Sequence, residues 1–153
     1  MGFPNAFQSY VPRTHCIDSQ TYGAILISPD NEILVVKGRQ SEKWGLPKGH
    51  GKNGEKPLNA AIREVGEETG INLEGRRPDS ERRLRVNSKR TGGLYFIFKL
   101  DNKPEIVPED TNEIMDAMWC PRDRLPFLVG NMDLKTFCRY RFHLDPTLSV
   151  PTL

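Results

Sequence analysis

The apolar residues of this chain fall into several short runs and one longer periodic stretch. Thr21–Ser28 (TYGAILIS) and Glu32–Lys37 (EILVVK) flank Pro29-Asp30-Asn31, and this pattern predicts a β-hairpin with a short turn. Both runs are almost continuously apolar, so we expect a sheet that is covered on both faces. Leu94–Leu100 (LYFIFKL) predicts a further buried strand.

The longer stretch predicts an amphipathic helix. From Leu58 to Val65 the apolar residues recur with a helical period. Pro57 suits the first helical position, and Gly70 suits the left-handed residue that closes a helix. Strands on either side of this helix favour an α/β fold with helices on both faces of a mixed sheet.

Two weaker patterns complete the elements. Trp44 and Leu46 alternate as in a short strand. Near the end of the chain, Asn131 or Asp133 can cap a final helix that runs to about His143. The length of 153 residues predicts a single domain. We place this domain at residues 21–145, between an N-terminal arm (1–20) and a C-terminal tail (146–153).

Composition narrows the class of protein only a little. The chain is 37% apolar and 27% charged, and its net charge of +2 does not by itself indicate a partner. Cys16, Cys120 and Cys138 are odd in number and widely spaced, which favours free thiols in a reducing compartment. Since no apolar run is long enough for a membrane span and no signal peptide is visible, we expect no membrane partner and a cytoplasmic location.

The predicted helix also carries a cluster of carboxylates. Glu64, Glu67 and Glu68 stand at i, i+3 and i+4, which places them on one side of a helix. Three like charges within one turn repel each other, and an oxygen-rich face is what a hard cation such as Mg²⁺ prefers. Arg63 can hold this face in place by pairing with Glu67, or with Glu55 in the preceding loop.

The order of these residues is more specific than their charge. Gly49, then five residues, Glu55, then seven residues, and finally Arg63-Glu64-Val65-x-Glu67-Glu68-x-Gly70-Ile71 resembles the Nudix hydrolase signature at every fixed position. The resemblance implies the Nudix fold, an α/β/α sandwich with a mixed sheet. It also implies hydrolysis, dependent on Mg²⁺ or Mn²⁺, of a pyrophosphate bond in a nucleoside diphosphate linked to another moiety.

The resemblance further assigns roles to residues. It implies that Glu64, Glu67 and Glu68, with Gly49 beside them, form the metal site, in which Glu67 and Glu68 are also catalytic. Glu55 and Arg63 would support the geometry of the loop and helix. An alternative of another class is a catalytically silent module that binds RNA or a nucleotide; it would be expected to lack one helix glutamate, and none is missing.

A pyrophosphohydrolase also needs a group that orients or deprotonates water, commonly a carboxylate near the metal. Glu109, Asp110 and Glu113 are the candidates outside the helix. We favour Glu113, because Asn112-Glu113-Ile114, followed by Trp119 and Leu125-Pro126, resembles the segment after the signature in mRNA decapping enzymes. An exposed loop glutamate remains the alternative.

Basic residues supply candidate contacts for phosphate. Lys48, just before the signature, is placed to meet phosphate oxygens, although it can equally be a solvated loop lysine. Residues 76–90 hold seven basic and two acidic residues, so they can bind polyphosphate or RNA backbone or simply form a solvated surface. The candidates in this stretch are Arg83, Arg85, Lys89 and Arg90.

The resemblance leaves the substrate open. Residues 20–130 look most like the Nudix domain of mRNA decapping enzymes, which implies the 5′ cap of mRNA as substrate. Pro47-Lys48-Gly49-His50 also resembles diadenosine tetraphosphate hydrolases, and diphosphoinositol polyphosphate is a further anionic alternative. The expected partner is therefore a nucleotide or a capped RNA, and the sequence leaves the oligomeric state undetermined.

Overall fold

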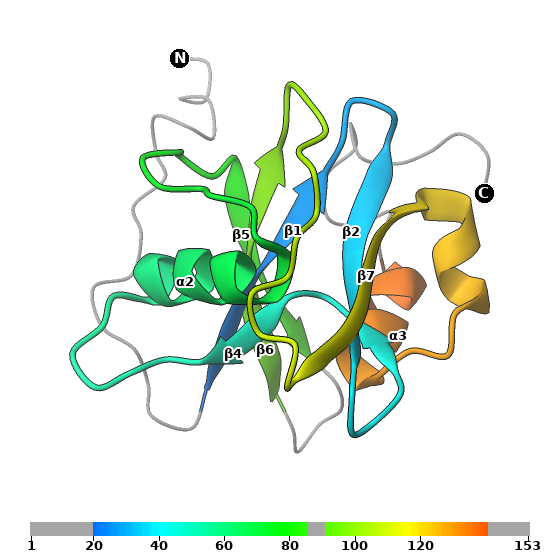
Figure 1. Cartoon of the computed structure of the whole chain (residues 1–153), viewed down its shortest axis with the longest axis horizontal. Coiled ribbons are helices and arrows are strands. Elements are labelled where there is room, and N and C mark those ends of the chain that lie inside the picture. Colours follow the sequence, from blue (N-terminus) through cyan, green and yellow to red (C-terminus); the bar gives the residue numbers. More distant parts are fainter. Residues whose placement is uncertain (1–19, 86–90, 141–153) are drawn as a thin grey trace, which may run out of the picture.

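The structure, a computed structural model, describes residues 20–85 and 91–140 of the chain. Its strands are β1 (Thr21–Ile27), β2 (Glu32–Gly38), β3 (Trp44–Gly45), β4 (Lys48–His50), β5 (Ser80–Arg85), β6 (Thr91–Lys99) and β7 (Ile114–Pro121). Its helices are α2 (Pro57–Thr69), the 3₁₀ helix η1 (Arg122–Phe127) and α3 (Met132–Tyr140). Figure 1 shows their arrangement around one sheet.

The sheet is mixed. Its main order is β3-β2-β1-β6-β5, while β4 pairs with β1 and β7 pairs with β2. β1 and β6 are parallel, in register from Tyr22 opposite Leu94 to Ile27 opposite Lys99. The other pairings between these strands are antiparallel.

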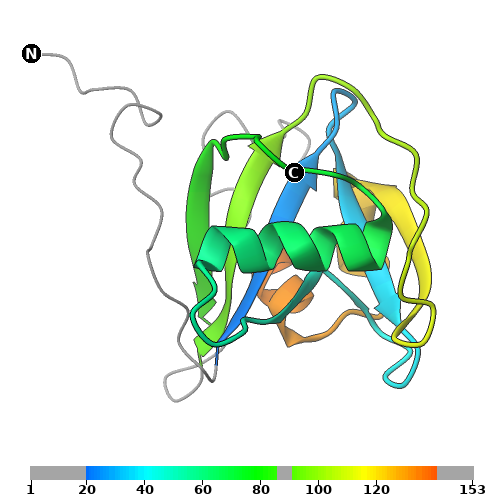
Figure 2. The ribbon, with the colours of Figure 1, turned by 60° about the vertical axis from the view of Figure 1, so that its left-hand side comes forward.

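Helices cover both faces of this sheet (Figures 1 and 2), with α2 on one side and α3 and η1 on the other. Side chains alternate along β1 because successive residues of a strand point to opposite faces. Ala24 and Leu26 pack in the cluster beneath α2, whereas Ile25 packs with Phe137 of α3. The predicted α/β/α sandwich with its two-sided core is confirmed.

The predicted hairpin forms, but its strands are paired only near the turn. Ile27 lies opposite Ile33, and toward the start of β1 the partner becomes β4 instead of β2. The segment between β3 and β4 crosses the opening, where the Ala24 N–H donates to the Pro47 carbonyl oxygen at 3.1 Å. A Cβ on Gly23 would lie 2.1 Å from that oxygen, so the crossing requires glycine at this position. The resulting space between β1 and β2 is where the candidate site lies.

The helix ends agree with the sequence where the structure describes them. Pro57 is in the first turn of α2, and Gly70 closes the helix with φ of 76°. Asn131 caps α3, since its Oδ1 accepts from the Leu134 N–H at 2.9 Å. Asp133, the alternative cap, is instead buried and accepts hydrogen bonds from β6.

Three of the described elements were not predicted, namely β4, the 3₁₀ helix η1 and β7. Residues 114–121 form β7, which pairs along its length with β2. Most residues of β7 are exposed or half-buried, so its two faces differ little in burial. Its sequence therefore shows no clear alternation of apolar and polar residues. The strand is instead stabilised by its apolar partner β2.

Several expectations lie outside the described residues. They are the arm up to residue 19, the tail, the expected helix end at His143, Cys16, Lys89 and Arg90. Cys120 and Cys138 form no disulfide with each other. In the described ranges, no helix is long and apolar enough to cross a bilayer.

Candidate functional site

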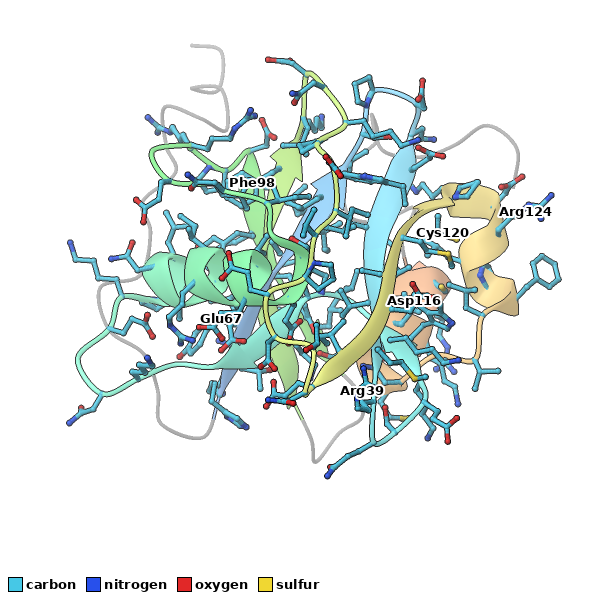
Figure 3. All side chains as sticks on the ribbon, viewed as in Figure 1. Arg39, Glu67, Phe98, Asp116, Cys120 and Arg124 are labelled. Carbon is cyan, nitrogen blue, oxygen red and sulfur yellow. The ribbon has the colours of Figure 1, made fainter. Side chains whose placement is uncertain are left out.

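The three glutamates of α2 differ in their environments. Glu64 and Glu68 are buried, with 8% and 6% of their surface exposed, whereas 40% of the Glu67 side chain is exposed. Figure 3 places Glu67 on the side of α2 next to β4. The sequence predicted one acidic face, and the fold divides it into two carboxylates against the sheet and one at its border.

Strand β4 packs tightly against the two buried carboxylates. The Lys48 N–H donates to Glu68 Oε1 at 3.1 Å. One residue further on, a Cβ on Gly49 would lie 2.1 Å from Cδ of Glu64. Glycine is therefore required here, because any side chain would displace the Glu64 carboxylate.

Arg63 connects the signature loop to the helix. Its Nε and Nη2 donate to the two oxygens of Glu55 at 2.9 and 3.0 Å, a bidentate pair. Its Nη1 donates to Glu64 Oε2 at 2.9 Å and to Glu67 Oε2 at 3.2 Å, and its Nη2 also donates to the His50 carbonyl oxygen at 3.1 Å. Both pairings expected from the sequence occur together, and the hydrogen bonds from Arg63 hold the pKa of Glu55 below its usual value.

Burial dominates the electrostatics of the inner carboxylates. It raises the pKa of Glu64, and it raises the pKa of Glu68 to about 8. The negative charge of Glu113 raises both pKa values further. These groups are therefore costly to ionise unless a positive charge lies beside them.

Glu113 reaches this region because its loop is tied to the end of α2. The Glu109 and Asp110 N–H groups donate to the Glu67 carbonyl oxygen at 2.9 and 2.8 Å. Asp110 Oδ1 accepts from the N–H groups of Asn112 and Glu113, both at 3.1 Å. Asp110 thus stabilises the turn, and of the three loop candidates only Glu113 lines the pocket described next.

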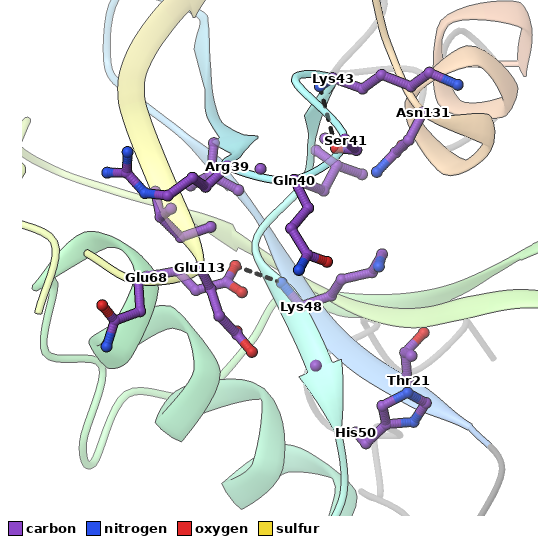
Figure 4. Close-up of a pocket in the computed structure, with 17 residues that line it drawn as sticks. Thr21, Arg39, Gln40, Ser41, Lys43, Lys48, His50, Glu68, Glu113 and Asn131 are labelled. Atoms are coloured by element: carbon purple, nitrogen blue, oxygen red, sulfur yellow. Dashed lines mark hydrogen bonds between the residues drawn. The ribbon is translucent and has the colours of Figure 1, made fainter. Parts of the chain in front are cut away.

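A cavity of about 510 Å³ joins these parts. In Figure 4, Glu68 and Glu113 occupy one side, and the side chain of Lys48 extends away from them across the pocket. The volume falls within the ~300–1,000 Å³ typical of small-molecule sites. Gln40, Ser41, Lys43 and Asn131 also line the cavity.

Sequence reasoning did not identify those four pocket residues. They come from the turn between β2 and β3 and from the cap of α3, which are about 90 positions apart in the sequence. The backbone joins the two segments, because the Trp44 N–H donates to the Val129 carbonyl oxygen and the Asn131 N–H donates to the Trp44 carbonyl oxygen, both at 2.8 Å. Asn131 was noted only as a helix cap.

The donor set fits a hard divalent cation. The candidate ligands are carboxylate oxygens, with the Gly49 backbone beside them, and buried carboxylates with raised pKa values favour a neighbouring cation. Among the residues that the structure describes, no three carboxylates converge as they stand. Arg63 draws Glu64 and Glu67 toward itself, so a bound ion would compete with Arg63 for their oxygens.

Part of the basic stretch lies at the same end of the sheet as the site. Gly49 pairs with Tyr22, Tyr22 with Leu94, and Leu94 with Arg83, so Arg83 stands in line with Gly49 across the sheet. Arg83 Nη1 donates to Gln20 Oε1. Arg85 lies further along β5, while Lys89 and Arg90 lie beyond the described residues.

Residues 19–140 match the NUDIX domain. A curated relative, the m7GpppN-mRNA hydrolase dcap-2 of Caenorhabditis elegans, is 32% identical over 114 residues, which cover 69% of this chain and 14% of that protein. The human 8-oxo-dGDP phosphatase NUDT18 is 30% identical over 109 residues, covering 67% of this chain and 32% of that protein. The matched region is thus a minor part of both relatives.

Solved structures share the fold. A C. elegans Ap4A hydrolase in a binary complex superposes with a TM-score of 0.62 at 23% identity, covering 82% of this chain and all of that one (100%). The Nudix hydrolase RenU from M. smegmatis gives a TM-score of 0.69 at 16% identity, covering 88% and 89% of the two chains.

Proposed function

This chain belongs to the Nudix family, as its signature indicated, and we propose that it is a pyrophosphohydrolase acting on a nucleoside diphosphate linked to another moiety. The observation that carries the proposal is the pocket in which Glu68 and Glu113 lie together, with Lys48 extending away from them. Nudix hydrolases generally use divalent cations, and we propose Mg²⁺ or Mn²⁺ here.

We assign each residue a role that follows from its charge. Glu64, Glu67 and Glu68, with the Gly49 backbone, would hold the cation, which supplies positive charge against the phosphate oxygens. Glu113 takes the proton of the attacking water at a carboxylate oxygen. The Lys48 ammonium donates to the phosphate and balances its charge. Glu55 and Arg63 keep the loop and helix in position.

For the substrate we propose the 5′ cap of mRNA. The proposal is supported by the relative named an m7GpppN-mRNA hydrolase and by the position of Arg83 in line with Gly49. Arg83 and Arg85, with Lys89 and Arg90, would contact RNA backbone leaving the pocket. The cytoplasmic location expected from the free cysteines suits this role.

Product analysis tests the substrate. The chain is incubated with Mg²⁺ and, in parallel, with cap-labelled RNA, diadenosine tetraphosphate and a diphosphoinositol polyphosphate. Release of 7-methylguanosine diphosphate from the RNA alone supports decapping. ATP and AMP from the dinucleotide, with the capped RNA intact, would replace decapping by dinucleoside polyphosphate hydrolysis, and turnover of the inositol compound alone would replace both.

Two glutamates of the loop provide a matched pair for the proposed base. Glu113→Gln should lower kcat strongly, whereas Glu109→Gln should retain it, because only Glu113 lines the pocket. Equal activity of both variants would contradict the role of Glu113.

The metal assignment has its own test. Glu67→Gln and Glu68→Gln should each abolish cation-dependent turnover while the chain remains folded. Retained activity in both variants would contradict the metal site. A wild-type chain that binds nucleotide but turns over none of the substrates would instead favour the silent binding module.

A further inference from the structure

The pocket has a second polar end that the proposed chemistry does not use. Asn131 lines this end together with Ser41 and Lys43. Val36 and Leu46, which are nearly fully buried, also line the cavity and give it an aliphatic wall. A flat apolar group with a polar edge fits such a compartment.

The side chain of Asn131 is held in one orientation. Its Oδ1 accepts from the Leu134 N–H at 2.9 Å as the cap of α3, which directs the oxygen toward the helix. Its backbone N–H donates to the Trp44 carbonyl oxygen at 2.8 Å, and its carbonyl oxygen accepts from the Lys135 N–H at 3.0 Å. The amide therefore cannot turn over without breaking the cap.

Strand β3 fixes the other end of this amide. A Cβ on Gly45 would lie 2.2 Å from Asn131 Nδ2, so Nδ2 rests directly against the backbone of β3. Within residues 20–85 and 91–140, Nδ2 donates no hydrogen bond. The pocket thus contains a fixed donor that has no acceptor of its own.

A fixed donor discriminates between purine bases. An asparagine usually reads adenine with both ends of its amide, accepting from N6 and donating to N7. Here the accepting end is already occupied by the cap of α3, so an adenine N6 amino group would find no acceptor at Asn131. Guanine carries the acceptor O6 where adenine carries the N6 amino group, so O6 can receive the Nδ2 hydrogen and N6 cannot. N7 is an acceptor in both bases and does not discriminate between them.

We propose that Asn131 selects the base of the substrate, and that it favours a base with a carbonyl edge, guanine in the first instance, over adenine. The base lies on the aliphatic wall with this edge toward Nδ2, and its phosphates extend toward Lys48 and Glu68. The inference rests on the proposed function only in placing the substrate in this pocket.

Calorimetric titration with GDP, IDP and ADP in the presence of Mg²⁺ tests the proposal without requiring turnover. GDP and IDP carry O6 where ADP carries the N6 amino group, so both should bind about tenfold more tightly than ADP, the equivalent of one hydrogen bond. Equal affinities for GDP and ADP, no binding of either, or an IDP affinity that matches ADP would overturn the assignment to Asn131.

Variants separate base selection from folding. Asn131→Asp keeps an acceptor for the Leu134 N–H but replaces the Nδ2 donor by an oxygen that can accept from adenine N6, so the GDP preference should vanish or reverse. Asn131→Ser also keeps a capping oxygen and should lose the preference without adding charge. A preference that is unchanged in both folded variants would overturn the proposal.

The chain offers a matched control. Asn72 is an exposed asparagine whose Oδ1 likewise accepts from a backbone N–H, that of Glu74, at 2.9 Å. Asn72→Asp introduces the same chemical change outside the pocket, and it should leave the ratio of GDP to ADP affinity unchanged. Because the readout is binding, an inactive chain that still prefers GDP would contradict the proposed hydrolysis and leave the base selection supported.

Discussion

The backbone of Gly49 lies against the carboxylate of Glu64, so closely that a Cβ would stand 2.1 Å from Cδ. The contact brings β4 next to α2 and leaves Glu64 no room to move toward the strand. A glycine in β4 and a glutamate 15 positions later in α2 are thus parts of one packing arrangement.

Gly49→Ala should therefore reduce activity without unfolding the chain. The added methyl displaces Glu64, and a misplacement of about 1 Å near the chemistry can cost roughly 100-fold in rate. Steady-state kinetics at saturating Mg²⁺ measures the loss, and circular dichroism checks the fold. Wild-type kinetics in a folded variant would contradict the role of this contact.

Gly66→Ala is the matched control, and it has an expected outcome of its own. Gly66 lies inside α2, and the nearest atom to an added Cβ, the Ile71 carbonyl oxygen, is 4.0 Å away. Since glycine in a helix costs about 1 kcal/mol relative to alanine, this substitution should raise the free energy of unfolding by about that amount. Denaturant unfolding measures it, and activity should be retained.

Arg63→Lys should loosen the signature loop. A lysine keeps the charge but cannot bind both oxygens of Glu55 and still reach Glu64, Glu67 and the His50 carbonyl oxygen. We expect a loss of about 1–3 kcal/mol in unfolding free energy, together with a lower kcat. Arg76→Lys, at an exposed loop residue, is the control and should change neither quantity. A lysine variant as stable and active as wild type would show that the fork of hydrogen bonds is dispensable.

The buried carboxyl of Glu68 predicts a pH dependence in metal-free protein. Burial raises its folded-state pKa from 4.5 to about 8, so between these values the folded chain holds a proton that the unfolded chain releases. The contribution to stability is fully present below the lower value and is lost as pH rises toward 8.

Glu68→Gln removes this dependence. In EDTA, the stability of the variant relative to wild type should increase from pH 5 to pH 8, by on the order of a few kcal/mol at most. Denaturant unfolding at several pH values measures the difference, and Mg²⁺ should reduce it because a cation stabilises the ionised carboxylate of the wild type. A difference that is constant with pH would contradict the raised pKa.

On the other face of the sheet, Tyr95→Phe should destabilise the chain. The fully buried Tyr95 hydroxyl donates to Asp133 Oδ2 at 2.5 Å, and the Gly93 N–H donates to the same oxygen at 3.1 Å. Loss of the hydroxyl leaves a buried carboxylate with one donor fewer, at a cost of about 1–3 kcal/mol. Thermal unfolding of this variant, Asp133→Asn and the double variant forms a cycle, and additive losses would show that the two side chains do not interact.

The sequence pattern was sufficient to predict those features that depend on a single segment of the chain. Pro57 and Gly70 mark the ends of α2 because their backbone preferences depend on φ alone, and the spacing of Glu64, Glu67 and Glu68 places them together on any helix. The apolar runs of β1 and β2 likewise predicted a covered sheet, because a strand buried on both faces is apolar at successive positions. β7 was missed because its stability comes from pairing with β2.

The sequence by itself therefore determined the helix, the acidic cluster, the supporting pair of Glu55 and Arg63 and the family. Only the tertiary structure decided that Glu68 is buried while Glu67 is half-buried, that Asp110 stabilises a turn while Glu113 enters the pocket, and that Asn131 lies beside Gly45. The physical reason is that burial, pKa and the direction of a hydrogen bond depend on atoms contributed by distant segments, whose approach no local period encodes.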